Sequence, residues 1–275
     1  GDWSSDVCSS DLLMPAWAAG EYLGVKTIIV APENQRYQLP SIQGIYTLFD
    51  ADKGRPLAQM DAPVLPAQRT AAASALASSF LSQKNSEKLL LIGTGALALP
   101  LIKAHASVRP IRQVYVWGRN FAKAKHLIER FKNPPFSLTA IENITDVIAE
   151  VDIISCATLS SKALVLGKYL RPGQHLDLVG AYRPDMREAD DEVIQRSHIF
   201  VDSKITAPQE TGDLAIPIQN GILKLTDIKA DLFELCRRQH QGRSTADEIT
   251  LFKSVGHALE DLAAARLAYE QLNLK

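Results

Sequence analysis

Cysteine is scarce in this chain, whose 275 residues include only Cys8, Cys156 and Cys236. An odd number of cysteines without metal-binding spacing argues against a disulfide framework and against a zinc site, and it is typical of a reducing compartment. The chain also shows no apolar run long enough to span a membrane and no recognisable signal peptide. We therefore expect a cytoplasmic protein with no bound metal and no membrane partner.

An excess of charge of either sign is missing too. The 30 lysines and arginines are balanced by 31 aspartates and glutamates, for a formal net charge of −1 at pH 7. Proteins that bind nucleic acids or anionic membrane surfaces usually carry a marked basic excess. The composition therefore favours a small molecule as the partner and no nucleic acid. The length is sufficient for two modest domains.

The most informative stretch is the short apolar run 89–92, which leads directly into GTGALA at 93–98. The pattern Gly-x-Gly-x-x-Ala is a dinucleotide-binding turn: the first glycine permits the turn, the second lets the backbone approach a pyrophosphate, and the alanine lets the next helix pack closely. The phosphates would bind the free N–H groups at the start of that helix. The alternative is an ordinary strand-to-helix turn without a ligand.

The end of the following strand predicts which dinucleotide binds. Enzymes that use NAD usually carry an acidic residue there for the ribose hydroxyls, whereas this chain reads Trp117-Gly118-Arg119-Asn120. Because a guanidinium in place of the acid suits a 2′-phosphate, we expect NADP(H), with NAD(H) as the less favoured cofactor. The alternative is that Arg119 is a solvated residue at the start of a helix.

A regular alternation of strands and helices surrounds the turn and predicts an α/β fold, with a Rossmann-type, doubly wound parallel sheet in a dinucleotide-binding domain over residues 84–245. The expected strands cover 89–92, 113–117, 136–140, 153–157, 175–179 and 198–201, and the expected helices cover 96–107, 121–131, 144–149 and 185–197. The carboxyl ends of the strands should line a crevice that contains the glycine turn, Arg119, Thr158 and Gly180.

Other segments flank this domain. Residues 1–12 (GDWSSDVCSSDL) resemble a translated sequencing adapter, so we expect a non-native leader in place of natural N-terminal sequence. Residues 13–83 predict a smaller β-rich α+β domain, with antiparallel strands at 26–30, 44–50 and 56–60 and an alanine-rich helix at 68–81. Towards the end of the chain we expect a loop at 212–214 and, within a C-terminal segment 246–275, a long helix over 247–272 interrupted near Gly256.

Six motifs in order carry a family resemblance. MPAW (14–17), GVK (24–26), RTAAASALAS (69–78), IGTGALA (92–98), LVGAYRPDMREAD (178–190) and LFKSVGHALEDLAAA (251–265) resemble the ornithine cyclodeaminase and mu-crystallin family. The resemblance implies a β-rich domain for substrate binding and dimerisation, a dinucleotide-binding domain, and a C-terminal helix that returns to the first domain. It also implies a homodimer.

The resemblance assigns roles to individual residues. Lys26 and Arg69 match basic residues that bind the substrate's carboxylate and serve catalysis, which agrees with the affinity of ammonium and guanidinium groups for carboxylates. Met14 matches a residue near the substrate. Without the resemblance, Lys26 and Arg69 would be interpreted as ordinary solvated charges. The residues expected around the dinucleotide are Gly93, Thr94, Gly95, Ala96, Leu97, Arg119, Asn120, Thr158, Gly180, Val255 and Gly256.

One departure from the family pattern bears on the reaction. Where the cyclodeaminases have Gly-Gly-Asp-Cys-Pro, residues 180–184 read Gly-Ala-Tyr-Arg-Pro, so Tyr182 stands at the place of the aspartate. A phenol, with a reference pKa of about 10, cannot act as a carboxylate base at neutral pH. The segment GAYRPDMRE instead resembles the ketimine-reductase branch of the family.

The expected function is therefore the NAD(P)H-dependent reduction of a cyclic imino acid, Δ1-pyrroline-2-carboxylate or Δ1-piperideine-2-carboxylate, to L-proline or L-pipecolate. Such an enzyme is an NADP-dependent oxidoreductase acting on a carbon–nitrogen bond, and His257 and Tyr182 are candidates for its proton donor. Two alternatives remain open. One is an ornithine cyclodeaminase or alanine dehydrogenase, and the other is a non-catalytic nucleotide or hormone binder of the mu-crystallin type.

Overall fold

The computed structural model describes residues 12–40 and 42–273, and these form two compact units. The described residues up to Arg69, together with those from His257 onward, make up the first unit, and residues 70–256 make up the second. The expected leader lies outside the described residues, apart from its last residue, Leu12, which begins a strand.

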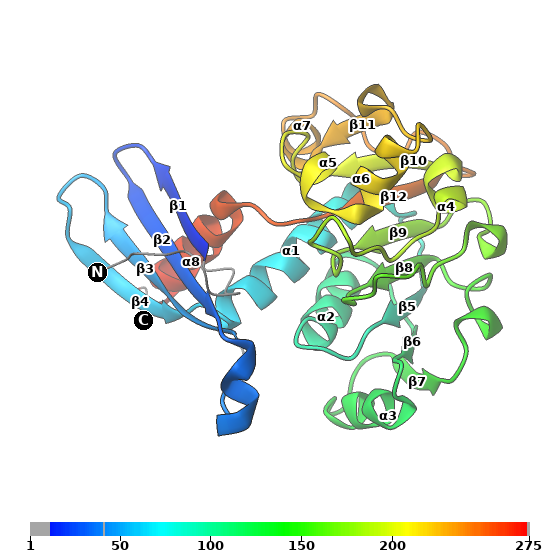
Figure 1. Cartoon of the computed structure of the whole chain (residues 1–275), viewed down its shortest axis with the longest axis horizontal. Coiled ribbons are helices and arrows are strands. Elements are labelled where there is room, and N and C mark those ends of the chain that lie inside the picture. The colour runs from blue at the N-terminus through cyan, green and yellow to red at the C-terminus, as the bar shows by residue number, and fades with distance from the viewer. Residues whose placement is uncertain (1–11, 41, 274–275) are drawn as a thin grey trace. The chain divides into compact units, whose positions relative to one another are not determined.

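The first unit is built on a four-stranded antiparallel sheet in the order β1-β2-β3-β4 (Figure 1). The elements are β1 (Leu12–Ala18), β2 (Tyr22–Val30), η1 (Pro32–Tyr37), β3 (Ile42–Asp50), β4 (Pro56–Asp61) and α8 (Ala258–Asn273). On one face of the sheet, Tyr46 and Leu48 pack with Leu262 and Ala265 of α8. The predicted antiparallel sheet is confirmed, while β1 was not predicted.

The opposite face of this sheet exposes large apolar side chains. Leu13, Trp17, Ile29 and Ile45 are 70%, 63%, 52% and 40% exposed. Because side chains alternate along a strand and the register pairs Leu13 with Thr27 and Thr27 with Ile45, these residues share the face that α8 does not cover. We call Leu13, Trp17, Ile29 and Ile45 the apolar face.

Helix α1 (Val64–Leu81) has its first residues in the first unit and the rest in the second. It begins four residues earlier than the predicted helix, and its first turn includes Pro66, a position where the missing N–H of proline is tolerated. At its other end, Arg109 donates to the carbonyl oxygens of Ser78 and Ser79, both at 2.8 Å. A cation at this end complements the helix dipole.

The second unit contains an eight-stranded parallel sheet in the order β11-β10-β12-β9-β8-β5-β6-β7, with helices packed around it (Figure 1). The strands are β5 (Lys88–Ile92), β6 (Gln113–Trp117), β7 (Ser137–Ile141), β8 (Ile153–Cys156), β9 (His175–Leu178), β10 (Ser197–Val201), β11 (Ile228–Asp231) and β12 (Ile249–Lys253). The helices are α2 (Ala98–Val108), α3 (Phe121–Glu129), α4 (Asp191–Arg196), α5 (Ala207–Glu210), α6 (Gly212–Gln219) and α7 (Leu232–Cys236), with 3₁₀ turns η2 (Ile144–Asp146), η3 (Gly167–Tyr169) and η4 (Leu225–Asp227).

Strand β5 explains why this sheet is buried on both sides. Leu90 and Ile92 belong to one apolar cluster, whereas Leu89 and Leu91 belong to another. Alternating side chains of a continuous apolar run therefore fill the cores on both faces, as in parallel sheets covered by helices on each side. The predicted Rossmann-type α/β fold is confirmed.

Four predicted elements differ from the structure. The helix predicted over 144–149 is wrong, because only the 3₁₀ turn η2 (Ile144–Asp146) forms there. The helix predicted over 247–272 is wrong in its first part, because residues 249–253 form β12 between β9 and β10. The loop predicted at 212–214 is wrong, because these residues begin α6, which is capped by Thr211. The helix predicted over 185–197 is confirmed only in its second half, α4, and Ala189 before it forms a bridge with Val165. A short apolar run cannot by itself distinguish a buried strand from a buried helix.

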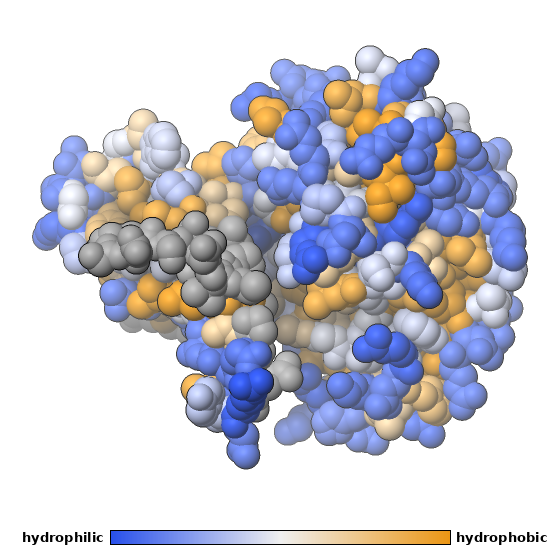
Figure 2. Space-filling view, in the orientation of Figure 1, coloured by the Kyte–Doolittle hydropathy of each residue, from blue (hydrophilic) through white to orange (hydrophobic). Residues whose placement is uncertain are grey.

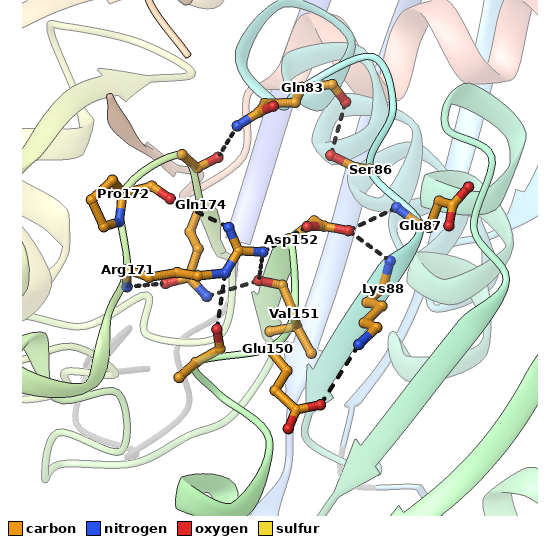
Figure 3. Close-up of polar contacts among 12 residues, drawn as sticks. Gln83, Ser86, Glu87, Lys88, Glu150, Val151, Asp152, Arg171, Pro172 and Gln174 are labelled. Atoms are coloured by element: carbon orange, nitrogen blue, oxygen red, sulfur yellow. Dashed lines mark hydrogen bonds and ion pairs between the residues drawn. The ribbon is translucent and has the colours of Figure 1, made fainter. Parts of the chain in front are cut away.

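A polar network connects the segments that precede β5 and β8, at the amino-terminal ends of these strands (Figure 3). Asp152 accepts hydrogen bonds from the backbone N–H groups of Glu87 and Lys88 at 2.8 and 3.0 Å, and from Arg171 Nη2 at 2.7 Å. Arg171 Nη2 also donates to the carbonyl oxygen of Val151 at 3.1 Å. This network lies at the opposite ends of the strands from the glycine turn, so it supports the fold rather than the crevice.

The surface of the second unit is mostly hydrophilic in the view of Figure 2, with smaller apolar areas between the polar side chains. None of the described helices combines the length and the apolar character that crossing a membrane requires.

Candidate functional site

The glycine turn connects β5 to α2 at the carboxyl end of the strand. Gly93 has a φ of +128°, and a Cβ atom there would lie 2.5 Å from the carbonyl oxygen of Ala157. Gly95 is exposed, and a Cβ atom there would meet nothing within 4 Å. The fold itself therefore requires glycine at position 93, whereas the space beside Gly95 is open to a ligand.

The start of α2 suits an anion. Its N-cap residue, Leu97, supplies no side-chain hydrogen bond, and its first turn contains no acidic residue. Thr94 and Ala96 lie in the turn itself, and Ala98 is fully buried against the sheet. Because uncapped N–H groups at a helix N-terminus bind negative charge, the residues present fit the diphosphate of a dinucleotide.

Arg119 and Asn120 follow β6, the neighbouring strand. A Cβ atom on Gly118 would lie 2.6 Å from Cγ2 of Thr94, so this loop touches the glycine turn. The Arg119 side chain is exposed and forms no hydrogen bond or ion pair with any described residue. Asn120 caps α3, with its Oδ1 accepting the N–H of Ala122 at 3.0 Å. The structure thus places Arg119 next to a residue that touches the glycine turn, and it gives Asn120 a capping role.

Thr158 and Gly180 follow β8 and β9, and a carboxylate that the sequence analysis missed ties them together. Glu188 accepts the backbone N–H of Thr158 at 2.7 Å, its hydroxyl at 2.9 Å, and the N–H of Gly180 at 2.8 Å. A Cβ atom on Gly180 would lie 2.1 Å from the backbone nitrogen of Thr158. Because Glu188 occupies both N–H groups, they are not free to bind a ligand.

Glu188 also lies beside a buried ion pair between Lys253 and Asp213. Lys253 Nζ is 3.0 Å from Asp213 Oδ2 and 3.9 Å from Glu188 Oε2, and all three side chains are fully buried. Burial raises the pKa of Glu188, and the nearby Lys253 ammonium acts in the opposite direction. Asp213 also accepts the backbone N–H of Glu188 at 2.7 Å. These contacts hold the ends of β8, β9 and β12 in one arrangement.

Val255 and Gly256 follow β12, and a second missed carboxylate holds their backbone. Asp202 Oδ2 accepts their N–H groups at 2.7 and 2.6 Å and the hydroxyl of Ser254 at 3.1 Å. Gly256 has a φ of +93°, which favours glycine. The interruption predicted here is therefore the turn after a strand, and not a break within a helix.

The two cations predicted to bind a carboxylate lie together in the first unit. Lys26 on β2 and Arg69 on α1 are only 4% and 9% exposed. Lys26 Nζ lies 2.6 Å from Asp261 Oδ2, Arg69 Nε lies 2.8 Å from Asp261 Oδ1, and Arg69 Nη1 lies 2.6 Å from Glu260 Oε2. The interpretation of both residues as solvated charges is therefore wrong. We call Lys26, Arg69, Glu260 and Asp261 the cation cluster.

Burial and charge act against each other in this cluster. Burial lowers the pKa of Lys26, and Asp261 opposes that change. Burial also acts to lower the pKa of Arg69, but the carboxylates of Asp261 and Glu260 outweigh it and leave this pKa raised. Tyr46, paired with Lys26 across β2 and β3, has its pKa raised by burial and by Asp261, and its hydroxyl has no hydrogen-bond partner among the described residues.

The remaining predicted residues occupy different places. Met14 pairs with Lys26 across β1 and β2, so the two side chains share the face that α8 covers. Tyr182 is half-exposed in the loop after β9. His257 directly precedes α8, and its Nδ1 accepts the N–H of Leu259 at 3.2 Å. None of these contacts identifies a proton donor.

The residues that the sequence analysis missed are the carboxylates of Glu188, Asp202, Asp213, Glu260 and Asp261 and the ammonium group of Lys253. Glu188, Glu260 and Asp261 lie inside quoted motifs, LVGAYRPDMREAD and LFKSVGHALEDLAAA, so a signal for them was present although no role was assigned. Asp202 lies outside every motif, and no sequence signal pointed to it.

The fold and site define an α/β protein with a Rossmann-type sheet, a dinucleotide-binding turn, and a small antiparallel unit that buries two cations. The chain belongs to the ornithine cyclodeaminase/mu-crystallin family, whose model matches residues 9–275. The predicted family is therefore confirmed.

Individual relatives resemble the chain over most of its length. Protein SAR DEFICIENT 4 of Arabidopsis thaliana is 42% identical over 95% of this chain and 83% of its own, and Delta(1)-pyrroline-2-carboxylate reductase of Paracoccus denitrificans is 39% identical over 91% and 79%. The solved Delta(1)-pyrroline-2-carboxylate reductase of Thermococcus litoralis, in complex with NADH and L-proline, is 36% identical over 94% of this chain and 81% of its own, with a TM-score of 0.89. An archaeal alanine dehydrogenase dimer with bound NAD is 29% identical over 95% and 81%, with a TM-score of 0.88.

Proposed function

We propose that this protein is an oxidoreductase that reduces the C=N bond of a cyclic imino acid, with a nicotinamide dinucleotide as the hydride donor. The observation that carries the proposal is the pair of buried cations, Lys26 and Arg69, held by one carboxylate in the same chain as an open dinucleotide-binding turn. Relatives named Delta(1)-pyrroline-2-carboxylate reductase support it.

The substrate side of the reaction rests on Lys26 and Arg69. Their ammonium and guanidinium groups would bind the carboxylate on C2 of the ring, and so fix the position of the imine carbon next to it. Since the carboxylate and the imine carbon are the same in both rings, we propose Δ1-pyrroline-2-carboxylate as a substrate and Δ1-piperideine-2-carboxylate as a second one. The products are L-proline and L-pipecolate.

The cofactor side rests on the glycine turn and its neighbours. The N–H groups at the start of α2 would hold the diphosphate, and the open space beside Gly95 would admit it. The bound nicotinamide supplies a hydride to the imine carbon, while a proton goes to the ring nitrogen. Solved relatives hold NADH and NAD. Our finer proposal, a preference for NADP(H), is supported by the unpaired Arg119.

We also propose a homodimer formed through the apolar face. Four large apolar side chains, Leu13, Trp17, Ile29 and Ile45, are exposed together on one side of the sheet, and exposed apolar patches commonly mark interfaces. The alanine dehydrogenase relative was solved as a dimer. Light scattering should report a dimer for the native chain and a monomer for Ile45→Lys, whereas Asp52→Lys, in the turn after the same strand, should remain dimeric.

The experiment that tests the function follows oxidation of NADPH and NADH with each cyclic imine, and identifies the product by chiral chromatography. We expect turnover with Δ1-pyrroline-2-carboxylate, and loss of most turnover in Lys26→Met and Arg69→Met. Parallel assays with pyruvate plus ammonia and with L-ornithine test the alanine dehydrogenase and cyclodeaminase alternatives. A protein that binds NADPH and turns over none of these compounds would be a binder, and the proposal would be wrong.

A further inference from the structure

One carboxylate organises both cations of the cation cluster. Asp261 lies in the first turn of α8, is fully buried, and uses its two oxygens for two different partners, Lys26 Nζ and Arg69 Nε. Removing one partner from a buried ion pair leaves an uncompensated charge, so both cations depend on Asp261 for their position.

The N–H donors of Lys26 and Arg69 that are not used within the cation cluster are available to a substrate. An ammonium group has three N–H donors, and the structure gives Lys26 one acceptor, Asp261. In the guanidinium group of Arg69, Nε donates to Asp261 and Nη1 donates to Glu260, while Nη2 has no acceptor among the described residues. A carboxylate can therefore bind Arg69 through Nη2, and it cannot use Nε unless Asp261 moves.

The charges in this cluster cancel. Two cations, Lys26 and Arg69, face two carboxylates, Glu260 and Asp261, so the cluster offers an incoming anion no net positive charge. Affinity for a carboxylate must then come from well-aimed N–H donors, whose directions depend on the groups that hold them.

We propose that Asp261 is a positioning residue, which holds Lys26 and Arg69 in one arrangement so that their remaining N–H donors bind the carboxylate of the imino acid together. This inference rests on the proposed function and names the residue that builds its substrate site. Asp261 does not touch the reacting atoms, because both of its oxygens are directed at the cations.

The test compares Asp261→Asn with the native chain in the imine reduction assay. The amide keeps the shape of the side chain but removes the charge, so we expect KM for Δ1-pyrroline-2-carboxylate to rise roughly 10- to 100-fold, as for a lost charge-assisted hydrogen bond. We expect kcat and KM for NADPH to change less than about threefold, since Asp261 contacts only the two cations that would bind the substrate's carboxylate. Asp261→Glu should restore part of the affinity. Glu270→Gln, which removes a carboxylate at a surface ion pair on the same helix, is the matched control and should leave KM unchanged.

A pH profile separates positioning from simple support of the fold. Lys26 faces Arg69 from α1, Glu260 and Asp261 from α8, and Tyr46 from β3. In the native chain, burial lowers the pKa of Lys26 and the Asp261 carboxylate raises it. Asp261→Asn removes that carboxylate, so the Lys26 ammonium deprotonates at lower pH than in the native chain. KM of the variant should therefore rise more steeply than KM of the native chain as pH increases from 7 to 9.

The outcomes are distinguishable. A native chain that reduces neither imine overturns the proposed function, and the role of Asp261 with it. If the native chain is active, an unchanged KM for the imine in Asp261→Asn overturns only the positioning role. An equal rise in KM for the imine and for NADPH, together with a lower melting temperature, overturns that role as well. Should Asp261→Asn fail to fold, Asp261→Glu keeps the charge but shifts both carboxylate oxygens relative to Lys26 and Arg69. An unchanged imine KM in that variant would also overturn the inference.

Discussion

Replacing Arg119 by alanine should weaken the preference for NADPH without affecting the fold. The side chain is exposed and has no partner among the described residues, so its removal breaks no internal contact. Under the proposed preference for NADP(H), the variant would lose one charge-assisted hydrogen bond to a phosphate in contact with solvent, worth about 1.4 kcal/mol, or about tenfold in kcat/KM. NADH has no 2′-phosphate, so its kcat/KM should stay the same.

The assay measures kcat/KM for NADPH and NADH side by side at a fixed imine concentration, at low and at high ionic strength. The effect of Arg119→Ala on NADPH should shrink as salt increases, because exposed charges are screened. Arg130→Ala, which removes a cation at the far end of α3, is the control and should leave the ratio unchanged. An unaltered NADPH to NADH ratio in Arg119→Ala, or an equal loss for both cofactors, would refute the assignment of the 2′-phosphate to this residue.

Four further variants test other parts of the structure. Gly95→Ala should keep the native melting temperature but raise the Kd for the dinucleotide about tenfold in calorimetry, because the new methyl group enters the open space that a diphosphate needs. Gly93→Ala should instead lower the free energy of unfolding in urea by about 1–3 kcal/mol, because of its positive φ and the nearby carbonyl oxygen. Asp152→Asn should cost about 1–3 kcal/mol of stability and leave kcat/KM unchanged, since it weakens the bonds to two N–H groups and to Arg171 far from the crevice. Burial lowers the pKa of His175 to about 3. Below about pH 6.5 this histidine is therefore protonated in the unfolded chain but not in the folded chain. The free energy of unfolding should fall as pH is lowered from about 6.5 towards about 4. His175→Asn should flatten that slope by up to about 1.4 kcal/mol per pH unit, and an equal slope in the variant would contradict the burial argument.

The sequence predicts those elements whose formation depends on residues that are neighbours along the chain. Strand β5 and the turn at Gly93 could be predicted because an apolar run, a glycine pattern and a following helix stand next to one another in the chain. Strand β12 could not, because its five residues end in a lysine, and a buried lysine makes sense only beside Asp213 and Glu188, which other segments supply.

The same limit applies to the candidate site. Lys26 and Arg69 could be selected through their motifs, but the carboxylate that joins them is 235 and 192 residues away along the chain. No periodicity or spacing rule connects such positions. Only the packing of α8 on the small sheet brings Asp261 to both cations.

The place of β12 in the large sheet has a consequence for synthesis of the protein. The strand lies between β9 and β10 although it is encoded after both of them, near the end of the chain. While only the residues up to α7 have emerged from the ribosome, β9 and β10 lack the strand that pairs with both of them. Their unpaired backbone N–H and C=O groups are prone to pair with other chains. A nascent polypeptide halted before Ile249 should therefore depend on chaperones to stay unaggregated, and release of the final segments should complete the sheet in one step.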